Sequence, residues 1–529
     1  MRMTPLFDNL RSFPSRRRVS SGVTGFYGSI AAALLLATAS SATAADAPVL
    51  GPSRMPSLGT VDQRFQSYNT EMVEITGGRF WKPYRSASDD KPPSPTGSNA
   101  PEGIDAQLFQ YRPPIDLANA RLRMLAKALG PAYVRISGTW ANTIFFADSD
   151  RAPSRPPPGF KVILTRRQWL GVVGFAKSVD AKIVTSFAIG AGTRDGKGVW
   201  MPDQAQRLLG YTQAIGGKIA AAEFMNEPDL AAIGGAPDGY GAAAYGRDFK
   251  LFRSLMHRAS PQTIILGPGA AGEDAKTEAL LAASASGLDA YSYHYYGTLS
   301  QRCRGTSTPE AALSEPWLSG TDRALAFQKT LRDRFMPGKP IWLTETADAA
   351  CGGNPWAVSF VDTFRYLDQL GRLAKEGVQV VMHNTLAASD YGMLDEKTLE
   401  PRPKYWGALL WRRLMGTTVL DAGVPIAMGL HIYAHCLRDT PGGVSLLVIN
   451  NDRNAPRALS LPTTSMRYTL DAVELSAPEV RLNGRALKLG AGDRLPRMQG
   501  VPAEAGISTF APATITFLAM PAAANGACR

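Results

Sequence analysis

The sequence predicts a (β/α)8 barrel followed by an all-β sandwich domain. Two observations lead to this fold class. Between residues 66 and 416, short apolar runs alternate with segments of helical periodicity, and eight such pairs can be counted, as in a parallel barrel of roughly 250 residues or more. After Gly416 the helical periodicity stops, and short β-like runs separated by Gly, Pro and Asn turns replace it.

The first residues have the features of a targeting segment. A basic region with arginines at 2, 11 and 16–18 precedes the apolar stretch 25–37, and Ala-Thr-Ala at 42–44 suits signal-peptide cleavage. Because the apolar run is shorter than the roughly 20 residues of a membrane-spanning helix, we expect a signal peptide over 1–44, with export to the periplasm or the medium, and no membrane anchor after cleavage. Losing five arginines and one aspartate would lower the net charge from +12 to +8, a basic balance that suits an acidic partner.

The barrel elements follow in chain order, each bounded by Gly, Pro or polar residues. The predicted strands cover residues 65–73, 133–138, 182–190, 220–225, 263–267, 288–296, 340–346 and 378–383. The predicted helices cover residues 117–129, 165–179, 203–215, 242–258, 275–285, 321–334, 358–376 and 403–415. Residues 76–112, with many Pro, Ser and Asp, are predicted to be a long loop after the first strand, and long loops are often functional.

The C-terminal region contains seven predicted strands. They cover residues 417–420, 432–436, 444–450, 457–461, 468–475, 480–482 and 513–519. The chain thus divides into a signal peptide over 1–44, a lead-in over 45–65 that can add a strand to the sandwich, a barrel over 66–416 and a sandwich over 417–529. Cysteines at 303, 351, 436 and 528 are an even number in an exported chain, which predicts two disulfides; spacing alone leaves three pairings open.

Two glutamates at strand ends are the main candidates for chemistry. Glu227 follows an apolar run and stands between Asn226 and Pro228, while Glu345 ends a second apolar run. A single glutamate at a strand end is most often only a solvated residue, but a pair at the active face of a barrel is the equipment for cleaving a glycosidic bond. Asn226 can then hydrogen-bond a sugar 2-hydroxyl.

Other polar residues follow the same strands. His294 and Tyr296 end the sixth strand and are candidates for the same pocket, although aromatic residues there can simply be core. Arg135, in the second strand, can pair with a catalytic carboxylate or form a structural ion pair. Gly352 and Gly353 expose backbone N–H groups that can bind an anion, or else form a simple turn.

Competing chemistries lack support in the sequence. It contains no GxSxG or HExxH motif, no zinc spacing and no nucleic-acid-binding motif, and its five histidines are scattered, so we expect no metal, no cofactor and no nucleic-acid partner. Basic residues at the predicted rim, Arg194, Lys197, Arg302 and Arg304, are candidates for contacts with sulfates or simply solvated charges.

Several motifs together resemble the heparanase-type enzymes of glycoside hydrolase family 79, in clan A of the retaining hydrolases. The resemblance lies in segment 130–139, Asn-Glu-Pro at 226–228, His-Tyr-Tyr at 294–296, Trp-Leu-Thr-Glu-Thr at 342–346 and the glycines at 352 and 353. It continues through residues 380–382, 391–395, 405–406, 416–417 and 435–436 to the Cys528 tail, and so spans about residues 60–529.

The resemblance implies roles for these residues. Glu227 would be the acid/base and Glu345 the nucleophile. Gly352, Gly353 and Tyr391 would hold the carboxylate of a β-linked glucuronic acid, although segment 347–351 is one residue longer than its counterpart in the family.

The resemblance also implies the disulfides Cys436–Cys528 and Cys303–Cys351. Where the animal enzymes carry a long excised linker, this chain has only the Pro-rich segment 148–159, so we expect activity as a single chain without proteolysis. The expected activity is that of a retaining endo-β-glucuronidase on heparan sulfate. The alternatives are an exo-β-glucuronidase that releases terminal glucuronic acid and, from another class, a non-catalytic glycan-binding protein.

Overall fold

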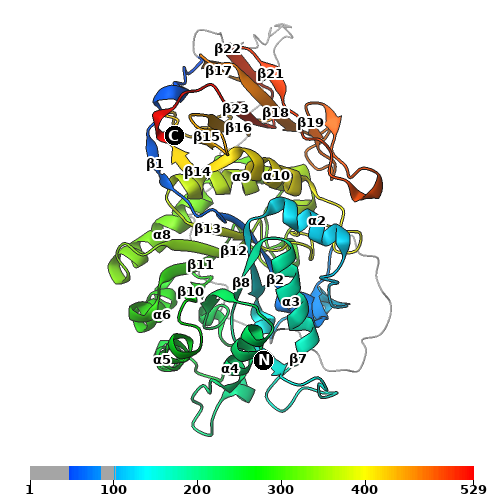
Figure 1. The fold of residues 1–529 in the computed structure, drawn as a ribbon, viewed down its shortest axis with the longest axis vertical. Coiled ribbons are helices and arrows are strands. Elements are labelled where there is room, and N and C mark those ends of the chain that lie inside the picture. Colours follow the sequence, from blue (N-terminus) through cyan, green and yellow to red (C-terminus); the bar gives the residue numbers. More distant parts are fainter. Residues whose placement is uncertain (1–46, 85–100, 102) are drawn as a thin grey trace, which may run out of the picture. The chain divides into compact units, whose positions relative to one another are not determined.

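A closed barrel of eight parallel strands forms the larger part of the computed structural model, which describes residues 47–84, 101 and 103–529 (Figure 1). Its strands are β2 (Gln66–Glu71), β5 (Ala132–Ser137), β8 (Ala181–Thr185), β9 (Ile219–Glu223), β10 (Ile264–Ala270), β11 (Ala290–Tyr296), β12 (Ile341–Ala347) and β13 (Val380–His383). The predicted fold class and all eight predicted strands are confirmed. The predicted signal peptide lies outside the described residues.

Helices cover the barrel between consecutive strands. They are α2 (Ala120–Leu129), α3 (Arg166–Ser178), α4 (Asp203–Ala214), α5 (Ala242–Ala259), α6 (Ala275–Ser284), α7 (Glu315–Leu318), α8 (Gly320–Phe335), α9 (Phe360–Lys375) and α10 (Pro403–Leu414). Of these helices, α7 alone has no counterpart among the predicted ones, and the short α1 (Met72–Thr76), described below, has none either. Within the described residues, no helix is both long enough and apolar enough to cross a bilayer.

The barrel interior changes from apolar to polar along the strands. One layer contains Tyr133, Ala221 and Trp342, and the rings of Tyr133 and Trp342 lie 4.9 Å apart. Two residues further along β5 and β9, Arg135 and Glu223 point into the same interior and form an ion pair. Because side chains of a strand alternate between its faces, a buried charged layer lies directly above the apolar layer, on the side where the strands end.

Two insertions interrupt the barrel pattern, and the hairpin of the first lies in segment 76–112, which was predicted to be a loop. The long segment after β2 contains the short helix α1 (Met72–Thr76) and a hairpin of β3 (Gly78–Trp81) and β4 (Phe109–Arg112). After β5, the strands β6 (Ile144–Ala147) and β7 (Val162–Thr165) pair in parallel on either side of the Pro-rich segment. Strands of four residues carry too short a pattern to be separated from loops in a Pro-rich sequence.

The C-terminal domain consists of antiparallel sheets of unequal size. The larger sheet joins β1 (Ser57–Thr60), β14 (Met415–Leu420), β15 (His431–Leu437), β16 (Val444–Asn450), β23 (Thr514–Met520), β18 (Ser465–Asp471), β19 (Arg481–Leu482) and β20 (Arg485–Ala486), and β21 (Val501–Ala503) pairs with β18. A second sheet contains only β17 (Arg457–Leu461) and β22 (Gly506–Phe510). The sequence analysis did not predict β20, β21 and β22.

The larger sheet has two buried faces. Leu446 and Val448 pack with Leu459 and Phe510 of the small sheet, whereas their neighbour Leu447 belongs to the core shared with the barrel. On that side the sheet contacts α9 and α10 (Figure 1).

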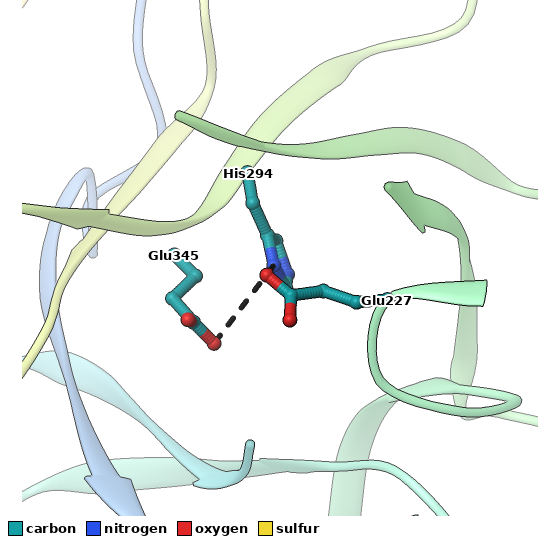
Figure 2. A group of neighbouring side chains, drawn as sticks. All are labelled: Glu227, His294 and Glu345. Carbon is teal, nitrogen blue, oxygen red and sulfur yellow. Dashed lines mark hydrogen bonds and ion pairs between the residues drawn. The ribbon is translucent and has the colours of Figure 1, made fainter. Parts of the chain in front are cut away.

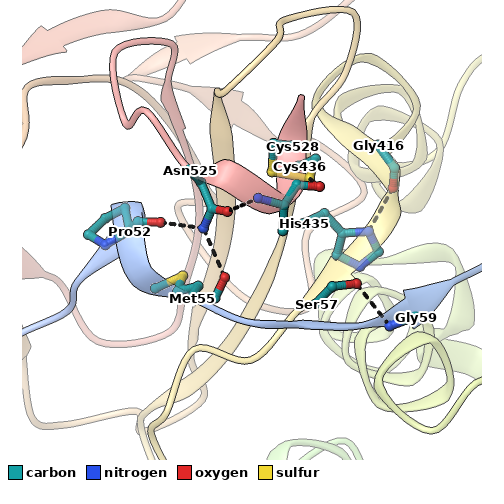
Figure 3. The surroundings of a disulfide bond; sticks show 10 residues. Pro52, Met55, Ser57, Gly59, Gly416, His435, Cys436, Asn525 and Cys528 are labelled. Carbon is teal, nitrogen blue, oxygen red and sulfur yellow. Dashed lines mark hydrogen bonds between the residues drawn. A yellow bond between two sulfur atoms is a disulfide. The ribbon is translucent and has the colours of Figure 1, made fainter.

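Both chain ends of the described part meet at the C-terminal domain. Strand β1, in the predicted lead-in, pairs antiparallel with β14. Figure 3 shows the disulfide Cys436–Cys528 beside Asn525, whose amide donates to the carbonyl oxygens of Pro52 (2.7 Å) and Met55 (2.9 Å). The disulfide and this amide thus fasten the C-terminal tail to β15 and to the lead-in.

A buried histidine joins the barrel to the C-terminal domain. His431 of β15 lies 2.6 Å from Asp368 of α9 through Nδ1 and 2.6 Å from Glu315 of α7 through Nε2. Tyr433 donates a further hydrogen bond to Asp368 at 2.5 Å. Burial alone would lower the pKa of His431, but the two carboxylates outweigh it and raise that pKa to about 9.

We expect this imidazolium to contribute stability that depends on pH. Because the pKa is raised from 6.5 to about 9, the stabilisation is fully present below pH 6.5, where it amounts to about 3 kcal/mol. It is lost as pH rises through 9. His431→Asn should therefore lower the free energy of unfolding at pH 6 and remove most of the loss that wild type shows between pH 6 and pH 10, measured by chemical denaturation. The exposed His257→Asn is the control, and equal pH dependence in wild type and His431→Asn would contradict the assignment.

Candidate active site

Glu345 lies inside the barrel because β12 is irregular. Between Tyr293 and His294 the register of β11 against β12 shifts, so that His294 pairs with Glu345. As a result, both Thr344 and Glu345 bond to interior side chains, although consecutive residues of a regular strand face opposite sides. A bulge of this kind re-aims a side chain at an active site.

Glu345 is held in its ionised form by donors on both oxygens. Arg135 donates to Oε2 at 2.7 Å, and the Tyr296 hydroxyl donates to Oε1 at 2.6 Å. Burial by itself raises the pKa of Glu345, but the neighbouring His294 and Arg135, together with these hydrogen bonds, bring it below its ordinary value.

Glu227 faces Glu345 from the loop after β9. Its backbone is left-handed, with φ 46°, and its side chain is 14% exposed against 7% for Glu345. Asn226 Nδ2 donates to Glu227 Oε2 at 3.2 Å, and His294 Nδ1 lies 3.1 Å from Oε1. Figure 2 shows the Glu227 carboxylate in front of the His294 ring and the Glu345 carboxylate beside it, and one carboxylate oxygen of each glutamate and one ring nitrogen of His294 all lie within 4.8 Å of one another.

Arg135 connects almost every polar group of the site. Besides Glu345, its guanidinium bonds to Glu223 at 2.9 Å and to Asn226 Oδ1 at 2.8 Å, and it is 1% exposed. Its Nη2 also lies 3.2 Å from His294 Nε2. Since guanidinium nitrogens only donate, that Nε2 must accept, which leaves Nδ1–H to donate to Glu227.

Glu223 is a buried carboxylate that the sequence analysis missed. Ser292 and Thr344 donate to its Oε1 at 2.8 and 2.7 Å, while Arg135 bonds to Oε2. Burial raises its pKa, but Arg135 and the hydroxyl donors bring that pKa below its ordinary value. Its position four residues before Glu227, inside an apolar run, was the available signal, because an acidic residue there must be paired.

Asn142 fixes the backbone next to Glu227. Its Oδ1 accepts from the N–H of Asn226 at 2.9 Å, and its Nδ2 donates to the carbonyl of Asn226 at 3.0 Å. No local motif distinguishes Asn142, so sequence reasoning did not find it.

A third buried glutamate lies beside the site. Asn384 donates to Glu71 Oε1 at 3.1 Å and to the Tyr296 hydroxyl at 3.0 Å, which connects Glu71 to Glu345. Glu71 Oε2 has no partner among the described residues. Burial, followed by the negative charge of Glu345, raises the pKa of Glu71 well above its ordinary value.

Of the two predicted glycines, Gly353 lies against Tyr391 and Gly352 against Trp81. Gly352 and Gly353 have φ of 81° and 84°, and a Cβ at Gly353 would stand 2.9 Å from Tyr391 N. At Gly352 a Cβ would stand 2.5 Å from Trp81 Cβ. Both the backbone conformation and the close neighbours therefore require glycine.

The predicted rim cations fall into two groups. The prediction of Arg194 and Arg302 as free charges at the rim is wrong. Arg194 pairs with Asp248 at 2.8 Å and Arg302 pairs with Asp390 at 2.5 Å, and all four side chains are nearly buried. Lys197 and Arg304 are exposed. The sequence could not show pairings with carboxylates so far along the chain.

Glu227, His294 and Glu345 are also spaced as a cation site would require. However, Arg135 contacts both Glu345 and His294, and its fixed positive charge opposes a metal ion at that point. This geometry therefore favours acid–base and nucleophilic chemistry.

Comparison with known proteins finds related sequences. Residues 113–371 match the model of the glycosyl hydrolase family 79 N-terminal domain. The chain is 30% identical to heparanase of Mus musculus, over 75% of this chain and 84% of that protein. It is 24% identical to hyaluronoglucuronidase of Hirudo nipponia, over 83% of this chain and 98% of that protein.

Solved structures share the fold at low identity. A 4-O-α-L-rhamnosyl-β-D-glucuronidase from Fusarium oxysporum superposes with a TM-score of 0.59 and 15% identity, covering 90% of this chain and 99% of that chain. An α-L-arabinofuranosidase from Thermotoga maritima also gives 0.59 and 15%, with 89% and 99% covered.

We expect Glu71 to carry a proton at neutral pH, because burial and Glu345 both oppose its ionisation. Infrared spectra of protein with labelled glutamate should show a protonated-carboxyl band at pH 7 that Glu71→Gln weakens. Glu310→Gln is the control, since hydrogen bonds lower the pKa of that exposed carboxyl. Identical spectra for wild type and Glu71→Gln would contradict the prediction.

Proposed function

The chain belongs to glycosyl hydrolase family 79 and is a glycoside hydrolase, and we propose that it cleaves β-glucuronidic bonds with retention of configuration. The observation that carries the proposal is the pair Glu227 and Glu345, whose facing oxygens lie within 4.8 Å. Carboxyl groups separated by about 5–5.5 Å are typical of retaining hydrolases, whereas inverting enzymes need a wider gap for a water molecule.

The surroundings assign the two roles. Glu345 accepts hydrogen bonds from Arg135 and Tyr296 and is the ionised nucleophile that attacks the anomeric carbon. Glu227, the more exposed carboxyl, gives its proton to the leaving oxygen as the glycosidic bond breaks. Water then attacks the covalent intermediate, Glu227 takes up its proton, and Glu345 is released as a carboxylate.

Four further residues support these carboxylates. Arg135 and His294 are buried and fully engaged with protein groups, so we assign them to positioning Glu345, Asn226 and Glu227. Tyr296 orients the nucleophile. The Oδ1 of Asn226 accepts from Arg135 and one N–H of its Nδ2 donates to Glu227, which leaves the second N–H of Nδ2 for the substrate 2-hydroxyl.

We assign the uronic-acid carboxylate to Gly352, Gly353 and Tyr391. Among the described residues, the N–H groups of the two glycines and of Tyr391 have no hydrogen-bond acceptor. Backbone N–H groups gathered at adjacent residues form an anion-binding concavity.

The proposed substrate is glucuronic-acid-containing polysaccharide, with heparan sulfate cleaved internally. Relatives named heparanase and the basic net charge of the chain support this choice. Exo action is the second candidate, because the β3–β4 hairpin packs Trp81 against Gly352 and so limits one side of the pocket. The intact glutamate pair, in which only Glu345 bonds directly to Arg135, argues against a non-catalytic glycan-binding protein.

We also place the chain outside the cytosol. The structure contains the disulfides Cys303–Cys351 and Cys436–Cys528, the pairing that the family resemblance implied. Disulfides of this kind persist in oxidising compartments. The short connection between β6 and β7 supports activity as a single chain.

Product analysis tests the substrate. Incubation of the mature chain with heparan sulfate should yield oligosaccharides of intermediate size, and 4-nitrophenyl β-D-glucuronide should release nitrophenol. Release of glucuronic acid alone from the polysaccharide would favour exo action, and no turnover of either compound would contradict the proposed function.

Variants of the two glutamates test the roles. Glu345→Ala should lose at least about 10⁴-fold in kcat, and Glu227→Ala about 10²–10⁴-fold on substrates with poor leaving groups. With azide and the aryl glucuronide, Glu345→Ala should form the α-azide, because azide attacks in place of the nucleophile, and Glu227→Ala should form the β-azide from the covalent intermediate. The opposite products would reverse the two roles, and unchanged turnover in either variant would remove that residue from the chemistry.

A further inference from the structure

A buried ion pair lies at the edge of the proposed uronate pocket. Arg302, in the loop after β11, bonds to Asp390, in the loop after β13, at 2.5 Å, with side chains 6% and 3% exposed. Asp390 immediately precedes Tyr391. The chemistry assigned above uses neither charge.

The pair also holds the segment that follows β3. The Arg302 guanidinium lies 4.1 Å from the centre of the Tyr84 ring and donates to the carbonyl of Lys82. The backbone N–H of Tyr84 donates to Asp390 at 3.1 Å, and the Tyr84 hydroxyl accepts from Arg302 N at 2.9 Å. Three segments from different parts of the chain therefore meet at one ion pair.

The loop after β12 is attached to the same assembly. Cys303, next to Arg302, is bonded to Cys351, next to Gly352. The carbonyl of Gly352 accepts from Ser389 Oγ at 3.0 Å and from Asp390 N at 3.2 Å. Thus Tyr391 and both glycines lie within one or two residues of a cross-link.

We propose that the Arg302–Asp390 pair is a positioning element that sets the specificity of the enzyme for uronic acids. The inference rests on the proposed function of the site. The pair acts through the backbone: with Asp390 held, the N–H groups of Gly352, Gly353 and Tyr391 converge on one carboxylate. Because Asp390 already neutralises Arg302, the pair contributes geometry rather than charge.

A second assembly with the same composition provides a matched control. Arg194 pairs with Asp248 at 2.8 Å and lies 4.7 Å from the centre of the Tyr240 ring. Arg194 follows β8, Asp248 belongs to α5 and Tyr240 lies just before α5. These residues bond to none of the proposed pocket residues. Breaking this pair tests for general loss of stability without the proposed effect.

The experiment compares an acid with its neutral analogue. We would measure kcat and KM for 4-nitrophenyl β-D-glucuronide and for its methyl ester in wild type, Arg302→Met, Arg302→Lys, Asp390→Asn and Arg194→Met. Arg302→Met and Asp390→Asn should raise KM for the acid about ten- to a hundredfold while kcat changes little and the ester is unaffected, since small misplacement of binding groups has effects of that size. Arg302→Lys should fall between wild type and Arg302→Met. Arg194→Met should leave the ratio of acid to ester activity unchanged.

Three results would overturn the inference. Equal losses for acid and ester would show general damage, and thermal unfolding of all variants identifies that case. An unchanged acid-to-ester ratio would show that the pair does not position the pocket. Tighter acid binding in Asp390→Asn together with weaker binding in Arg302→Met would show that Arg302 contacts the carboxylate directly.

The disulfide provides an independent measurement. Cys303→Ser with Cys351→Ser should also lower the acid-to-ester ratio, whereas Cys436→Ser with Cys528→Ser should not. If wild type turns over neither compound, the proposed function itself fails; if wild type is active and every ratio is unchanged, only the positioning role fails.

Discussion

The buried guanidinium of Arg135 is the interaction on which the active site depends. It contacts Glu345 and Glu223 directly and lies close enough to Glu71 for each charge to shift the pKa of the other. Burying two ionised carboxylates in a barrel core would cost several kcal/mol each without such a partner. The cation therefore makes it possible to place acidic chemistry at the centre of the barrel rather than in an exposed loop.

This arrangement also gives the two facing carboxylates different electrostatic surroundings. Glu345 bonds directly to the cation, while Glu227 reaches it only through the side chains of Asn226 and His294. One carboxyl is thus strongly stabilised as an anion and the other is left closer to solvent. Retaining hydrolysis needs this asymmetry, since one group must attack while the other donates a proton.

The regular parts of the molecule were predictable because burial leaves a periodic pattern, and all eight barrel strands carry it. The irregular parts were not: the bulge that turns Glu345 inward depends on the register between β11 and β12, which no single segment encodes. The same limit applies to the site. Glu227 and Glu345 stand at recognisable strand ends, but Arg302 was predicted as a free cation because its partner is 88 residues away in the chain.

Charge balance around the proposed uronate pocket explains how such a site can be selective. Arg135 is compensated by Glu345 and Glu223, and Arg302 by Asp390, so neither arginine has an unbalanced charge to offer a ligand. A substrate carboxylate must then be bound mainly by oriented N–H dipoles, which act only at short range and in the correct direction. Recognition by dipoles depends on the position of the backbone, and for this reason the cross-links around Gly352, Gly353 and Tyr391 matter more for selectivity than the basic net charge of the chain.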